Sequence, residues 1–116
     1  MQVQVTTDNH IKGSEELVKK VEAEVLGVID RFLDQLTRVE VHINDLNGHK
    51  GGDHHMRCVM EARISGHQPA AVSCESPTLD DAVSGAAVKL EHALEHTLGK
   101  LAQRKGRTSF GGDQTI

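Results

Sequence analysis

Apolar residues recur along the chain with two different periods, and these periods predict its secondary structure. Alternation over residues 2–6 predicts a first strand with Val3 and Val5 on one face. Apolar residues spaced by three and four then predict a single helix over 14–36. Ser14 is the expected N-cap of this helix, because two glutamates follow it in the first turn, where the helix dipole favours acidic groups.

Three more strands are predicted by alternation, over 37–45, 56–64 and 68–75. In the last two strands the inward positions are even-numbered, so directly opposed residues must have numbers with an even sum. A three-residue turn at 65–67 meets this condition and places Cys58 opposite Cys74. We favour two packed thiols over a redox pair, because a buried thiol is inert in a reducing compartment.

A second helix begins within the segment SPTLDD, and its start has two possible assignments. Thr78 and Asp81 have the spacing of a capping box. Ser76 as cap with Pro77 at the first helical position is the competing assignment. The apolar stripe of this helix is rich in alanine, which allows close approach to a sheet.

These elements give the order β-α-β-β-β-α, in which every element has one apolar face. The economical arrangement is an α+β sandwich of two layers, with both helices on one face of a four-stranded sheet. The length of 116 residues fits one domain, expected over 1–103 and followed by a flexible tail over 104–116.

The charge distribution changes this picture, because the net charge of −4 hides an asymmetry. Residues 1–99 contain nine Lys/Arg against sixteen Asp/Glu, whereas 100–107 contain four basic residues and no acidic one. This basic segment is either an interaction site for a polyanion or a helix end that complements the helix dipole. With no Trp, no Tyr and two Phe, the composition argues against RNA binding by stacking of bases on aromatic rings.

The sequence also bears on compartment. The N-terminus lacks both the basic region and the apolar region of a secretory signal. No apolar run is long enough to span a membrane. Two cysteines in such a chain indicate reduced thiols. We therefore expect a cytoplasmic protein with no membrane partner.

Eight histidines raise the question of a metal site. The segment HALEH at 92–96 matches the H-x-x-E-H pattern of a class of zinc peptidases, but a third ligand and a substrate cleft are not evident. A second cluster, His49, Asp53, His54 and His55, lies in a glycine-rich loop, where histidines are usually solvated. No Ser-His-Asp arrangement, phosphate loop or dinucleotide motif is present. We predict a non-enzymatic protein without metal, cofactor or small-molecule substrate, and leave open whether His49, His54, His55, His92 and His96 sense pH or bind metal.

The remaining candidate functional residues are lysines and arginines. Helices on one side of a sheet can present cations to phosphates around a groove, and each neutralised phosphate releases counterions. The alternative is a solvated surface in which these cations alternate with acidic residues. The candidate nucleic-acid contacts are Lys19, Lys20, Arg31, Arg38, Lys89, Lys100, Arg104, Lys105 and Arg107.

Three segments carry a resemblance to a known family: MQVQVTTDN at the start, RFLDQLTRVEVHI at the helix-to-strand transition and TLDDAVSGAAVKLEHAL in the second helix. They resemble the ribosome hibernation-promoting factor and ribosome-associated inhibitor family, formerly labelled as modulators of a sigma factor. The resemblance covers about residues 1–101. Double-stranded-RNA-binding domains share the architecture, but they lack the first strand and have a Lys-rich start to the last helix.

The resemblance implies a bacterial stress or stationary-phase protein that binds ribosomal RNA in the mRNA–tRNA channel of the small subunit. There it would block tRNA and mRNA sterically. It further implies a short member of the family, without a C-terminal dimerisation domain, so the isolated protein is expected to be a monomer. Whether ribosomes are paired or only silenced is left open.

Two features depart from the family pattern. His92 and His96 stand between Lys89 and Lys100, where members usually have Lys or Arg, and the loop before the third strand is longer and rich in His. Because neutral His releases no counterions, binding should strengthen as the pH falls through about 6.5, the range in which free imidazole titrates. The alternative function is a cytosolic protein-interaction regulator that acts through its acidic surface.

Overall fold

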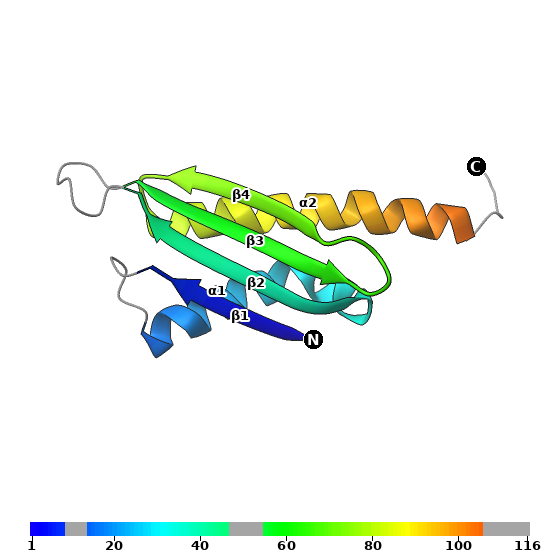
Figure 1. The fold of residues 1–116 in the computed structure, drawn as a ribbon, viewed down its shortest axis with the longest axis horizontal. Coiled ribbons are helices and arrows are strands. Elements are labelled where there is room, and N and C mark those ends of the chain that lie inside the picture. Colours follow the sequence, from blue (N-terminus) through cyan, green and yellow to red (C-terminus); the bar gives the residue numbers. More distant parts are fainter. Residues whose placement is uncertain (9–13, 47–54, 106–116) are drawn as a thin grey trace.

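A four-stranded mixed sheet with two helices on one face forms the protein, as the sequence predicts (Figure 1). The structure is a computed structural model that describes residues 1–8, 14–46 and 55–105, with side chains described up to Gly99. The sheet order is β1-β2-β3-β4, with bounds Gln2–Thr7, Leu36–Asp45, Met56–Ile64 and Ala70–Ser76. The helices are α1 (Glu15–Ile29), the 3-10 helix η1 (Asp30–Gln35) and α2 (Leu79–Lys105).

The first helix differs from the single element predicted over 14–36. Ser14 caps it as expected, with its Oγ accepting from the Leu17 amide at 3.1 Å. The α-helix ends at Ile29, however, and the chain continues as η1. Apolar residues spaced by three and four fit either helix type, so the sequence pattern could not separate them. The tighter turn buries Phe32 and brings Leu36 directly into β2 without a loop.

The β3–β4 hairpin has the predicted register, and Cys58 lies opposite Cys74. Gly66, at φ 77°, occupies the left-handed conformation of the turn, and the His67 amide donates to the Ile64 carbonyl at 3.1 Å. Pairing extends only to Ala70, so β4 begins two residues later than predicted. Pro69 comes directly before it and has no amide hydrogen to contribute to a ladder.

The start of α2 resolves the choice between two caps. The Thr78 Oγ1 accepts from the Asp81 amide at 3.2 Å, and the Thr78 carbonyl accepts from the Ala82 amide. Thr78 is therefore the N-cap, and the helix begins at Leu79. The Ser76 Oγ accepts only from the Thr78 amide, at 3.4 Å, which places Ser76 outside the helix.

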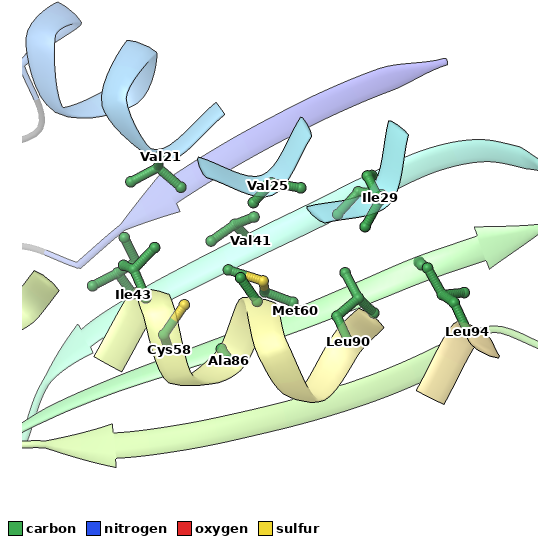
Figure 2. Packing of buried hydrophobic residues seen from close by; sticks show 14 of the residues in the cluster. Val21, Val25, Ile29, Val41, Ile43, Cys58, Met60, Ala86, Leu90 and Leu94 are labelled. Atoms are coloured by element: carbon green, nitrogen blue, oxygen red, sulfur yellow. The ribbon is translucent and has the colours of Figure 1, made fainter. Parts of the chain in front are cut away.

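The core lies between the sheet and the helices, as Figure 2 shows. α1 contributes Val21, Val25 and Ile29, and β2 contributes alternate residues such as Val41 and Ile43. Fully or nearly fully buried residues on β3 and α2 complete it: Cys58, Met60, Ala62, Ala82, Ala86, Ala87, Leu90 and Leu94. Small residues bring α2 close to the sheet, since a Cβ at Gly85 would lie 2.4 Å from the Cys74 Sγ.

Candidate nucleic-acid interface

Two of the predicted basic residues, Lys20 and Arg31, lie along the seam between α1–η1 and α2. The Lys20 Nζ contacts the Asp80 carboxylate at 2.8 Å. The Arg31 guanidinium contacts Glu95 at 2.8 Å and Glu91 at 3.5 Å. Both cations are thus paired with carboxylates on α2.

The parallel direction of the two helices explains this pairing. Lys20 pairs with Asp80, Glu24 accepts from Ser84, and Arg31 contacts Glu91, so each contact joins residues sixty positions apart. Partners at a constant separation require helices that run in the same direction and remain adjacent over several turns. The fold therefore places the acidic side of α2 against the basic residues of α1 and η1.

The ion pairs shift the pKa values of Lys20, Arg31 and Glu95 toward their charged forms. The hydrogen bond to Asp80, together with its charge, raises the pKa of Lys20. The hydrogen bond from Arg31 lowers the pKa of Glu95, and the same bond raises the pKa of Arg31. Lys20, Arg31 and Glu95 are consequently charged at neutral pH, and their side chains are exposed to solvent.

Arg31 also lies at the edge of a hollow. Its guanidinium stands 4.5 Å from the centre of the Phe32 ring, an arrangement that orients the cation. The shallow depression beside it measures about 440 Å³, and its lining comes from η1 and α2: Arg31, Phe32, Gln35, Glu95, Leu98 and Gly99.

Lys19 and Lys89 lie away from the seam. Lys19 is exposed and has no hydrogen bond or ion pair within the described parts of the chain. The Lys89 Nζ donates to the Ser73 carbonyl at 2.9 Å. Lys89 thereby covers part of the free edge of β4, a position in which lysine discourages edge-to-edge pairing.

Arg38 lies on the opposite face of the molecule. Its neighbour Val39 points into the core, so Arg38 projects from the sheet face that no helix covers. There it contacts Glu40 at 3.2 Å and donates to the Gln4 side chain. The structure therefore does not bring all the predicted cations onto one surface.

The same open sheet face carries two arginines that the sequence argument missed, Arg57 and Arg63. Arg57 contacts Glu75 at 3.1 Å, and Glu75 also contacts His55 at 2.7 Å. These hydrogen bonds lower the pKa of Glu75, and the bond from His55 contributes more than the bond from Arg57. Arg63 lies 3.7 Å from Glu40. Alternation alone would have found both arginines, since each occupies an outward position between inward apolar ones.

The C-terminal end of α2 holds the remaining candidates. The helix includes Lys100, Arg104 and Lys105, so two residues that the sequence assigned to the tail are helical. Arg107 and the rest of the predicted tail lie outside the described residues. In Figure 1 this end of α2 extends past the turn between β3 and β4.

The helical layer before that end is acidic. Its carboxylates are Glu15, Glu16, Glu22, Glu24, Asp30, Asp34, Asp80, Asp81, Glu91 and Glu95, against the four cations Lys19, Lys20, Arg31 and Lys89. A coherent positive surface is therefore absent from the described helical layer up to Gly99. The sequence segment that contains basic residues and no acidic one begins at Lys100, at the end of α2.

The histidines and cysteines form no metal centre in the part of the chain that the structure describes. No three potential ligands come together there. His92 and His96 are exposed on α2, and His49, Asp53 and His54 lie outside the described residues. Burial raises the pKa of Cys58 to about 12, with a further contribution from Cys74 beside it. Among the described helices, none has the length and apolar content needed to cross a bilayer.

Comparison with protein families supplies the decisive observation. Residues 3–102 match the profile of the family described as sigma 54 modulation protein / S30EA ribosomal protein. The chain belongs to this family. The match spans every element of the fold from β1 to α2.

Solved structures share the fold at low sequence identity. The N-terminal domain of Protein Y from Thermus thermophilus is 16% identical and superposes with a TM-score of 0.68, covering 84% of this chain and 99% of that one. A ribosomal subunit interface protein from Coxiella burnetii is also 16% identical, with a TM-score of 0.69 and coverage of 85% and 99%. A comparison with curated protein sequences gave no significant match.

Membership in the family confirms the resemblance that the sequence segments carried. It leaves the nine candidate contacts as predictions, since a fold shared at this identity carries no residue roles. The geometry separates the eight described candidates into two paired cations at the seam, the exposed Lys19, one cation on the opposite face, one at a sheet edge and three at the end of α2.

Proposed function

We propose that this protein binds ribosomal RNA of the small subunit in the mRNA–tRNA channel and sterically blocks tRNA and mRNA during stress or stationary phase. The observation that carries the proposal is the family match over residues 3–102. The fold shared with the ribosomal subunit interface protein from Coxiella burnetii supports it. The protein acts in the bacterial cytoplasm, as a monomer when isolated, and without catalysis, metal or cofactor.

Within this function we assign the first RNA contacts to the end of α2. Lys100, Arg104 and Lys105 lie on two successive helical turns without an acidic residue between them. Such a segment concentrates counterion release at one end of an otherwise acidic protein. Beyond the described residues, Arg107 would extend this contact. Lys19 lies near the start of α1, level with the start of α2, and would contact RNA separately. Arg38 and Lys89 would contact RNA only where the channel surrounds other sides of the protein.

Sedimentation tests the proposal directly. Purified protein is mixed with small ribosomal subunits and centrifuged through sucrose at about 50 and 200 mM salt, a range over which phosphate-mediated binding falls steeply. We expect co-migration at the lower salt concentration and release at the higher one. The complex should also exclude tRNA, measured as loss of labelled tRNA from the subunit peak. Protein that stays at the top of the gradient at low salt contradicts the proposal.

The acidic helical layer favours one alternative, a regulator that binds a partner protein through this surface. Ten carboxylates against four cations would attract a basic protein segment. The two functions separate in cell extract, because a ribosome-binding protein sediments with ribosomes at low salt. A protein-interaction regulator migrates with a smaller complex under the same conditions.

A further inference from the structure

We propose that the seam between α1–η1 and α2 is a binding site for RNA phosphodiesters that the protein's own carboxylates keep closed. Asp80, Glu91 and Glu95 would then determine specificity, since RNA must displace them to reach Lys20 and Arg31. The inference rests on the proposed function for the identity of the ligand. It adds a regulated site that neither the family match nor the shared fold assigns.

The two cations are placed so that one ligand can engage both. Lys20 and Arg31 are eleven residues apart, which is about three helical turns, and they therefore lie on the same side of the first helical segment. At about 1.5 Å per residue, they are separated by roughly 16 Å along the axis. Their side chains are 59% and 52% exposed, so both lie at the surface, and a ligand that displaces their carboxylate partners can reach them.

Around Arg31 the site is partly formed. The Phe32 ring orients the guanidinium on one side, and the depression lined by Gln35, Leu98 and Gly99 lies beside it. Gly99 has no side chain, and a Cβ built there would meet nothing within 4 Å, so the hollow is open along α2. A phosphate seated in this depression would lie next to Glu95, which also lines it. Binding therefore requires the Glu95 carboxylate to move away from Arg31.

Carboxylate and phosphate oxygens accept the same hydrogen bonds from a guanidinium or an ammonium group, so they compete for the same donors. The ion pairs at the seam are exposed, and exposed pairs contribute little to stability. The carboxylates can therefore exchange with phosphates reversibly. Because they are tethered to α2, however, their effective concentration is high, and a single mobile phosphate competes poorly.

This competition produces selectivity. The carboxylates repel a flexible single strand, and each phosphate that binds must displace a tethered competitor. A folded RNA surface that presents phosphates to Lys20 and Arg31 together gains both contacts in one binding event. The seam therefore suppresses non-specific binding to RNA strands more than binding to a structured target.

The test compares two charge-matched double variants. Glu91→Gln with Glu95→Gln removes the carboxylates that hold Arg31, whereas Glu22→Gln with Asp34→Asn removes two carboxylates that have no ion pair within the described residues. Binding of a labelled oligouridylate is followed by fluorescence anisotropy across a salt series at pH 7. Far-UV circular dichroism confirms the fold of each variant, and Glu95→Gln alone replaces the first pair if that pair fails to fold.

We expect the seam variant to bind the oligouridylate about tenfold more tightly than the wild type does. The affinity of the control variant should rise by less than about threefold. One freed cation should also steepen the log–log salt dependence by about 0.7, the value for one additional phosphate contact on a single strand. Arg31→Gln should abolish the gain in the seam variant and have little effect in the wild type.

Equal gains in the seam and control variants would show that only net charge matters and would overturn the proposal. A gain that survives Arg31→Gln would overturn it as well. Failure of the proposed function has a different signature, in which none of the proteins migrates with small subunits. An Arg31-dependent gain on oligouridylate in that case would leave the closed site standing without a ribosomal role.

Discussion

The two halves of α2 perform different tasks. From Leu79 to Glu95, its anchored half, the helix packs on the rest of the fold: its small and apolar residues are buried against β3 and β4, and its acidic side contacts α1 and η1. From Lys100 to Lys105 it extends past the β3–β4 turn and contains three cations and no carboxylate (Figure 1). One continuous helix thus carries contacts that determine the fold in one segment and a concentration of positive charge in another, the cationic end.

Substitution of two glycines, one in each half of α2, should give the largest difference in the free energy of unfolding. Gly85→Ala should be less stable than Gly99→Ala by about 1–3 kcal/mol, because its Cβ would overlap the Cys74 Sγ. Gly99→Ala should itself stabilise the protein by about 0.5–1 kcal/mol, since alanine favours helix and nothing lies within 4 Å. Urea unfolding followed by circular dichroism measures both values. Cys74→Ala should restore stability in the Gly85→Ala background, and a failure to do so would contradict the packing argument.

The cationic end is tested by removing its charge. Replacing Lys100, Arg104 and Lys105 by Gln should weaken binding to small ribosomal subunits about tenfold or more, equivalent to about 1.4 kcal/mol. The matched control replaces three arginines of the open sheet face by Gln: Arg38, Arg57 and Arg63. Both triple variants change the net charge equally. Equal losses of affinity in quantitative sedimentation would show that the end of α2 is not a preferred contact.

The N-cap of α2 provides a smaller effect on the anchored half. Thr78→Ala should destabilise the protein by about 1 kcal/mol, because the Asp81 amide loses its acceptor. Ser76→Ala should cost less, since its hydroxyl lies 3.4 Å from a single amide before the helix. Thermal unfolding of the two variants measures the difference. Equal changes in Tm would indicate that the two hydroxyls share the capping role.

The smallest effect concerns the thiols beneath the anchored half. With its pKa raised to about 12, Cys58 exists as thiolate to only about one part in ten thousand at pH 8, so iodoacetamide should leave it unmodified in the folded protein. In the unfolded chain it ionises near 9, so the free energy of unfolding should fall as the pH rises from about 9 toward 12. Mass spectrometry locates the label, and rapid native modification of Cys58 would contradict the burial.

The sequence predicted most of the fold because alternation and three-to-four spacing report directly on which face of an element is buried. The opposition of Cys58 and Cys74 followed from the parity of the inward positions and the three-residue length of the turn. The switch to a 3-10 helix at Asp30 was not predictable, since Ile29, Phe32 and Leu36 fit either helix type. The ion pairs of Lys20 and Arg31 were not predictable, because Lys20–Asp80 and Arg31–Glu91 each join residues that are sixty positions apart.

The sequence by itself determined the element order, the inward face of each strand and helix, the hairpin register and the concentration of positive charge in residues 100–107. These are local properties, set by the period of apolar residues and the spacing of turns. Only the tertiary structure decided that the helices run parallel with their acidic and basic sides in contact, and that Arg38 lies on the opposite face. The pairing of charges depends on which elements become neighbours. Burial of the apolar faces decides which elements are neighbours, and the charged positions have little influence on that burial.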